Sequence, residues 1–117
     1  MTSPNRQLLA QASRQALDLC RRAIAVRPIA VPQIQESVLA QLEWLTDFAE
    51  GRNDDRARLG EMVFGHYVAR DEISSDDGSL IDALHNAFYA ASTYRRGLKI
   101  DPSTLSAMLP NPSLERP

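Results

Sequence analysis

The chain has 117 residues, of which 44% are hydrophobic and 24% are charged, and its formal net charge is −2. This length fits a single domain, and the composition is typical of a globular protein rather than a disordered or membrane-spanning one. The single cysteine excludes an internal disulfide framework and provides no cysteine-based metal site.

The charges are distributed unevenly along the chain. Residues 1–30 carry five Arg and one Asp, residues 31–90 carry twelve acids and four Arg, and residues 91–117 carry four bases and two acids. The acidic middle argues against nucleic-acid binding there, because phosphate contacts need Lys and Arg. It favours a basic protein partner, since opposite charges speed encounter and set orientation.

The first predicted helix covers about residues 4–26. Ser3 and Pro4 are typical of an N-cap followed by proline in the first turn, and Arg27 before Pro28 predicts the end. Its apolar residues recur at helical spacing on one side, namely Leu9, Ala12, Ala16, Cys20 and Ala23. This position predicts that the Cys20 thiol is buried and inert.

The second predicted helix starts near Val31 and Pro32, and Gly51 marks its expected end. Its inward positions are Ile34, Val38, Leu42, Leu45 and Phe48.

A third helix is predicted from a cap at residues 53–55 to about Arg70. Phe64 and Tyr67 then point away from the inward side, which either reflects a helix buried all round or marks the aromatic anchors of an interface. Gly65 costs about 1 kcal/mol in a helix relative to alanine, which indicates close helix packing or close approach of a partner. The expected inward residues are Leu59, Met62, His66 and Ala69.

A polar turn at residues 74–79 precedes the fourth predicted helix, which begins near Leu80 and ends at Gly97 after the basic pair Arg95 and Arg96. From Pro102 onward the sequence turns to Pro, Ser and Asn without periodicity. We therefore predict a single helical domain over residues 1–101 and a disordered, flexible tail over 102–117. Four short-looped helices with one apolar stripe each predict an all-α, antiparallel bundle. The stripe of the fourth helix is Leu80, Leu84, Ala87, Ala91, Tyr94 and Leu98.

The sequence offers little for catalysis. Asp82 and His85 are three residues apart and are predicted to face each other on a helix, but no nucleophile stands at a recognisable spacing. The Glu-x-x-His signature of carboxylate metal bundles is absent from the sequence. We expect no enzyme activity, no metal and no cofactor, and a small nucleotide-processing enzyme using Asp82 and His85 is the least favoured alternative.

Neither a secretion signal nor an apolar run of about 18 residues is visible in the sequence. The expectation is a soluble, cytoplasmic protein that does not contact a membrane.

Acidic residues form two candidate surfaces. One is a face of the second helix, on which a partner-binding role is considered for Glu43 and Asp47 beside Glu36 and Glu50. The other is the exit from the third helix, where Arg70, Asp71 and Glu72 lead to Asp76 and Asp77. Each is either an ordinary solvated face or a negative surface that fits a basic partner.

Several segments carry a resemblance to a known family. They are Phe-Gly-His-Tyr-Val-Ala-Arg-Asp at 64–71, Leu80, Ala83 with Leu84, Ala87-Phe-Tyr at 87–89 and Arg-Gly-Leu-Lys-Ile-Asp at 96–101. The chain resembles the small helical immunity proteins of type VI secretion systems that neutralise an NAD(P)-degrading effector. The resemblance covers residues 60–101 well and residues 10–50 only as a helical pattern. Its matching positions include Gly65, Arg70, Asp71 and Tyr89, whereas the turn before the fourth helix has an extra residue and a tail follows Pro102.

This resemblance implies an inhibitor that binds a toxin domain and covers its substrate cleft without doing chemistry. Acids at the exit of the third helix are then expected to pair with basic groups in a cleft that holds pyrophosphate. The predicted partner-binding residues are Tyr67, Arg70, Asp71, Glu72, Asp76, Asp77 and Tyr89, with Glu43 and Asp47 as second choices. The alternative from another class is a homodimeric helical adaptor whose face around Phe64 and Tyr67 is self-complementary.

Overall fold

The computed structural model describes residues 3–74 and 78–108. Within these ranges the chain forms helices and no strand, which confirms the all-α prediction. The elements in chain order are α1 (Pro4–Val26), α2 (Pro32–Ala49), the 3-10 helix η1 (Arg56–Glu61), α3 (Phe64–Ala69), α4 (Gly78–Arg95) and α5 (Pro102–Met108).

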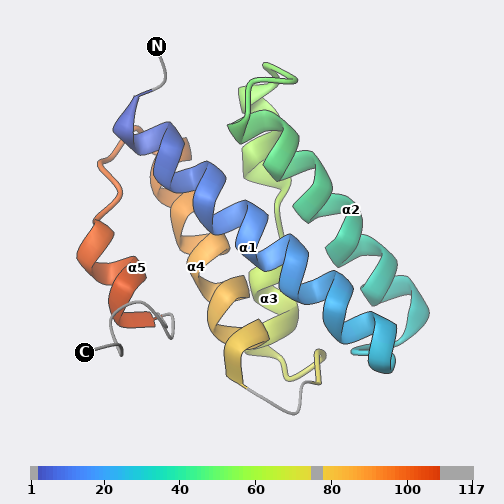
Figure 1. The fold of residues 1–117 in the computed structure, drawn as a ribbon. Helices are drawn as coiled ribbons and strands as arrows, with labels where there is room; N and C mark the ends of the chain where they lie inside the picture. Colours follow the sequence, from blue (N-terminus) through green and yellow to red (C-terminus); the bar gives the residue numbers. More distant parts are fainter. Residues whose placement is uncertain (1–2, 75–77, 109–117) are drawn as a thin grey trace.

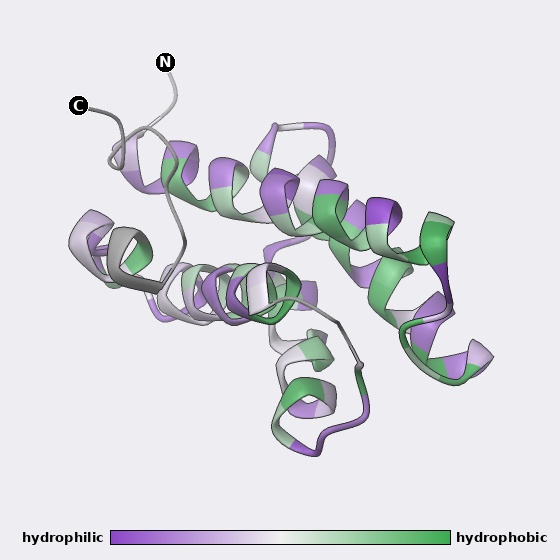
Figure 2. Cartoon of the chain, turned by 60° about the horizontal axis from the view of Figure 1, so that its bottom comes forward, coloured by the Kyte–Doolittle hydropathy of each residue, from purple (hydrophilic) through white to green (hydrophobic). Residues whose placement is uncertain are grey.

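Helix α1 packs against both α2 and α4, and these two helices run back in the opposite direction (Figure 1). The short helix α3 contacts α4 and α2, while η1 and α5 both pack on α4. Hydrophilic residues lie along the outer side of α1 in Figure 2. The predicted helical bundle is therefore confirmed, with three long helices and three short elements.

The core is built from the apolar stripes of the three long helices. Its fully buried side chains include Leu9, Ala16, Cys20, Val38, Leu42, Leu45, Leu84 and Ala87. Leu98 was expected on the same stripe as Leu84, but it lies beyond the end of α4 and is 51% exposed. The periodicity of each long helix thus predicted its buried side except at this one end.

Two of the helices end at glycine as predicted. Gly51 (φ 84°) and Gly97 (φ 73°) adopt the left-handed conformation just past α2 and α4. The N–H of Gly51 donates to the Phe48 carbonyl, and that of Gly97 to the Tyr94 carbonyl, as in a Schellman motif. At the start of α1, the Ser3 side chain accepts a hydrogen bond from the Arg6 N–H, which confirms the predicted N-cap.

The predicted third helix is wrong as a continuous element. The chain forms η1, bends, and begins α3 only at Phe64. The Gln41 side chain of α2 accepts hydrogen bonds from the N–H groups of Val63 (2.7 Å) and Phe64 (3.1 Å), so it caps α3 from another helix. The new start reverses the expected faces, because Phe64 is 0% exposed whereas His66 is exposed.

The glycine in α3 is explained by helix packing. A Cβ atom on Gly65 would lie 2.5 Å from Cγ of Phe88 on α4. Phe64 also packs edge-on against Phe88, with ring centroids 5.4 Å apart. The close-packing interpretation of Gly65 is therefore confirmed.

The segment after Gly97 differs from the prediction. Residues 102–108 form α5 instead of a flexible tail, and Leu105 is 8% exposed. Asp101 explains the start of this helix, because its carboxylate accepts hydrogen bonds from the Ser103 N–H (2.9 Å) and the Thr104 hydroxyl (3.2 Å). The rest of the predicted tail, residues 109–117, lies outside the described residues.

Cys20 is fully buried in α1, as predicted, and burial raises the pKa of its thiol from 9.0 to about 11. Between these two pH values the unfolded chain releases the thiol proton and the folded chain keeps it. We therefore expect the free energy of unfolding to fall as the pH rises from about 9 to about 11. Urea unfolding at several pH values measures this slope, and Cys20→Ala should make it shallower. An equal slope in both proteins would contradict the prediction.

Candidate partner-binding surface

Helix α3 ends in the same hydrogen-bonding pattern as α2 and α4, but without glycine. The Asp71 N–H donates to the Val68 carbonyl (3.1 Å), and the Glu72 N–H donates to the Tyr67 carbonyl (2.9 Å). Asp71 takes the left-handed position with φ 60°, and no other non-glycine residue of the described ranges has a positive φ. The backbone thus turns sharply at Asp71 and leaves its side chain exposed.

We call the residues Tyr67, Arg70, Asp71 and Glu72 the exit surface. The Tyr67 hydroxyl lies 3.2 Å from the Ser37 hydroxyl of α2, and its ring is half-buried. The Arg70 guanidinium stands 3.8 Å from the Glu72 carboxylate. Within the described ranges, no side chain donates a hydrogen bond to the Asp71 carboxylate or forms an ion pair with it. The exit surface therefore offers one carboxylate that no described side chain of this protein neutralises.

The predicted contacts Asp76 and Asp77 lie outside the described residues.

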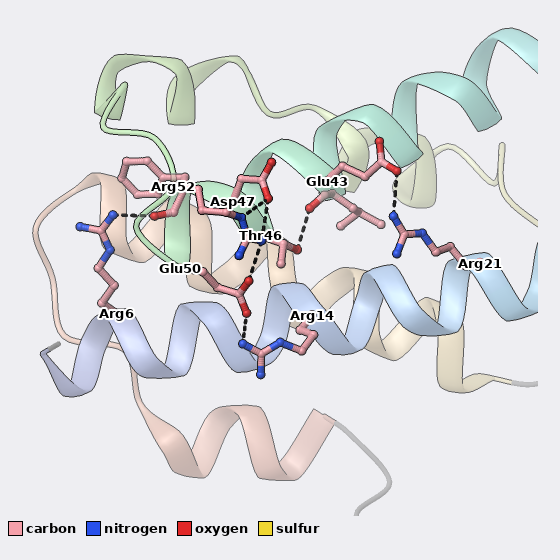
Figure 3. Close-up of polar contacts among 10 residues, drawn as sticks. Arg6, Arg14, Arg21, Glu43, Thr46, Asp47, Glu50 and Arg52 are labelled. Atoms are coloured by element: carbon pink, nitrogen blue, oxygen red, sulfur yellow. Dashed lines mark hydrogen bonds and ion pairs between the residues drawn. The ribbon is translucent and has the colours of Figure 1, made fainter.

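The acidic face of α2 has partners inside the chain. Figure 3 shows Glu43 paired with Arg21 of α1 (2.9 Å) and Glu50 paired with Arg14 of α1. Asp47 pairs with Arg52 (2.6 Å), which also reaches Glu50. The pairs of Glu43 and Asp47 are about half-exposed, so each contributes little to stability, whereas the Glu50 side chain is only 19% exposed. Together the pairs reduce the negative charge of this face.

The structure does not bring the acids of α2 together with the exit surface. Gln41 faces α3, whose backbone it caps, and Glu43 follows two residues later. Two residues correspond to a rotation of about 200° on a helix, so Glu43 points to the opposite side, toward α1. Binding by both acidic groups at once would need a partner that reaches around α2.

Tyr89 also lies apart from the exit surface. Its hydroxyl accepts a hydrogen bond from the Asp101 N–H (3.2 Å) and so ties α4 to the start of α5. This contact accounts for a tyrosine at position 89 without a partner. A contact between Tyr89 and another protein stays a prediction.

Two exposed apolar side chains near the exit surface were not singled out from the sequence. Val26 is 78% exposed and Val31 is 57% exposed, one on each side of the turn between α1 and α2. This turn touches the segment after α3, because the Ser74 N–H donates to the Ile29 carbonyl (2.7 Å). The available signal was their position near the two prolines, since Val26 stands two residues before Pro28 and Val31 directly before Pro32, where the chain leaves one helix and enters the next.

The structure does not support the two alternatives, a homodimeric adaptor and a nucleotide-processing enzyme, at the side chains on which each depends. Phe64 is fully buried, so the proposed self-complementary face of Phe64 and Tyr67 is wrong in its first residue. No hydrogen bond or ion pair joins the described side chains of Asp82 and His85, and His85 is exposed.

No group of three or more His, Cys, Asp or Glu side chains within the described ranges is placed to hold a metal ion. None of the helices in these ranges has the length and the apolar character that a membrane span requires.

Comparison with known proteins gives one family. The family model of Tsi6 matches residues 8–93, a range that includes most of α1, all of α2, η1 and α3, and most of α4. Searches of curated proteins and of solved structures give no match. This range also contains the whole exit surface and most of the segments that carry the resemblance to immunity proteins of type VI secretion systems. The chain therefore belongs to the Tsi6 family of type VI secretion immunity proteins.

Proposed function

We propose that this chain protects cells by binding a toxin domain that hydrolyses NAD(P)⁺ and by covering its substrate cleft. Membership of the Tsi6 family carries the proposal, because that family confers immunity to the NAD glycohydrolase Tse6. The chain acts by blocking the cleft and pairing with its charged groups, and it catalyses no reaction. The cytoplasm is its place of action, since the dinucleotide pool that such a toxin depletes is there.

The exit surface is the proposed contact. A cleft that binds the pyrophosphate of a dinucleotide needs cationic groups or helix N-termini, and these attract carboxylates as well. Asp71 provides an exposed carboxylate that has no side-chain partner among the described residues, and the half-buried Tyr67 provides an aromatic ring of the kind enriched at interface centres. Arg70 and Glu72 complete this contact, and a contact through Asp76 and Asp77 stays a prediction from the sequence.

Glu43 and Asp47 remain second choices for the contact. We now place Tyr89 with them, because its hydroxyl already accepts a hydrogen bond from the Asp101 N–H. The two acids of α2 would first have to give up their arginine partners, or share them with the toxin. Such an exchange lowers the binding free energy gained from each new ion pair, because the carboxylate is already paired in the free protein and is paired again in the complex.

Co-expression with the toxin domain encoded beside this gene tests the proposal. The chain should restore growth and keep cellular NAD⁺ near its level without toxin, and the two purified proteins should form a stable complex. Failure to restore growth, together with no complex at micromolar concentrations, would contradict the proposed function.

Two matched charge reversals separate the candidate surfaces. Asp71→Lys with Glu72→Lys should slow association with the toxin, most strongly at low salt, because attraction at encounter is lost. Glu43→Lys with Asp47→Lys changes the same number of charges on the other face and should slow association much less. Stopped-flow or surface-binding kinetics at two salt concentrations measure both. A larger effect of the second pair would move the contact to the face of α2.

A further inference from the structure

A hollow of about 430 Å³ lies beside the end of α3. Val68 of α3, Ile73 of the following segment and Ile81 of α4 give it an apolar wall. Of the residues that the structure describes, Asp71 and Ser74, which are both exposed, also line it. Among the described residues, the hollow therefore combines three apolar side chains with one acidic residue, Asp71.

The fold holds Asp71 beside this hollow in a costly conformation. The equivalent positions after α2 and α4 are glycines, which adopt positive φ freely. An L-residue in the left-handed region costs about 1 kcal/mol, although aspartate tolerates it better than most. The backbone at Asp71 is held by the hydrogen bonds of the helix end on one side and by the buried Ile73 on the other.

We infer that this hollow receives an arginine side chain of the toxin, an inference that rests on the proposed function. The aliphatic stem of the arginine packs on Val68, Ile73 and Ile81, and its guanidinium pairs with the Asp71 carboxylate. Arginine suits this lining because it buries an apolar stem while its charged head stays at the rim. Its planar head also pairs with a carboxylate through two parallel hydrogen bonds and loses less hydration than an ammonium group.

Asp71 is suited to this role because no ion pair with another described side chain has to be broken before its carboxylate can bind the arginine. The nearby Arg70 and Glu72 already face each other, whereas the Asp71 carboxylate has neither a hydrogen-bond donor nor a cation within the described part of the chain. A role in binding the arginine also explains why residue 71 is an aspartate, whereas the corresponding residues after α2 and α4 are glycines. The conformational cost in the free protein is offset in the complex.

Binding and stability measured on the same variants test the inference. Asp71→Asn and Asp71→Gly should each raise the Kd for the toxin domain by about 30-fold or more. The bound toxin covers the pair of Asp71 and the arginine, and this is the usual effect of removing one member of a desolvated charge pair. Asp71→Gly should at the same time raise the melting temperature, because it removes the left-handed strain. Opposite changes in binding and stability cannot arise from misfolding. Asp18→Asn, which removes one charge from the exposed side of α1, is the control and should leave Kd within about twofold.

Two further variants identify the occupant. Ile81→Phe should fill the hollow and weaken binding while the fold is kept, as circular dichroism will show. Asp71→Arg should bind a toxin in which one cleft arginine is changed to aspartate better than it binds the unchanged toxin. That rescue would identify the arginine.

The outcomes separate this inference from the proposed function. If the unchanged chain does not bind the toxin, the proposed function fails and the inference fails with it. If the unchanged chain binds and Asp71→Asn binds within twofold as well, the inference is overturned while the function stands. Weak binding by Ile81→Phe together with normal binding by Asp71→Asn would mean that an apolar side chain fills the hollow, which also overturns it.

Discussion

Replacing Phe64 with alanine is expected to lower the free energy of unfolding by about 3–5 kcal/mol, the usual cost of truncating a buried phenylalanine. The side chain is 0% exposed and packs edge-on against Phe88. Its loss would leave a cavity between α3 and α4, where the short α3 has few other core residues. Urea unfolding followed by circular dichroism measures the change.

Val26→Ala is the matched control for a surface apolar residue. Val26 is 78% exposed, so its truncation should change the free energy of unfolding by no more than about 0.5 kcal/mol. A loss of less than about 1 kcal/mol for Phe64→Ala would contradict the buried position. It would return this ring to the role of an interface anchor.

Gly65→Ala is expected to destabilise the fold by about 1–3 kcal/mol, the range for overpacking a well-filled core. Alanine is the better helix former by about 1 kcal/mol, so a net loss would show that packing outweighs propensity here. The added Cβ would lie 2.5 Å from the Phe88 ring, which cannot be accommodated without moving α3 or that ring. Thermal and urea unfolding both measure this loss.

Gly60→Ala is the control for the same chemical change. Its Cβ would lie 2.9 Å from Nε of Arg95, an exposed and flexible side chain that can move away. Its effect should stay within about 0.5 kcal/mol. Combining Gly65→Ala with Phe88→Ala should give a smaller loss than the sum of the two, because the removed ring makes room. Additive effects would mean that the two residues do not meet.

The sequence was informative where the structure depends on neighbouring residues. Ser3 caps α1 through a contact three residues away, and Gly51 and Gly97 end their helices through bonds within one turn. Such signals are visible in any window of a few residues. The apolar stripes of the long helices are equally local, because their spacing alone sets the buried side.

The predicted third helix failed because its start is set from a distance. Gln41 caps Val63 and Phe64 across more than twenty residues, and no local pattern reveals that contact. Moving the helix start changed which side chains face α4, so Phe64 and His66 exchanged their expected environments. The error at one boundary therefore became an error about the candidate site.

The start of α5 could have been predicted. Asp101 followed by Pro102 is an N-cap with proline at the first helical position, the same signal that was used for α1. The change to Pro, Ser and Asn after Pro102 favours a flexible segment and points the other way. Only Leu105 of the described side chains in α5 is buried, which made the apolar pattern too weak to detect.

The candidate site was predicted in part. The run of charged residues at 70–72 placed Asp71 at a helix end, where the structure also has it. The sequence did not reveal its left-handed backbone, because glycine or asparagine is the usual residue there. It also did not reveal that Glu43 pairs with Arg21, because that pair depends on how α1 and α2 lie against each other.

Hydrogen exchange of the chain, free and bound to the toxin domain, tests the central claim most directly. If the end of α3 enters the toxin cleft, the backbone amides of residues 66–74 should exchange much more slowly in the complex. Amides in α2 near Glu43 and Asp47 should change little. Slower exchange confined to α1 and α2, with residues 66–74 unaffected, would contradict the account.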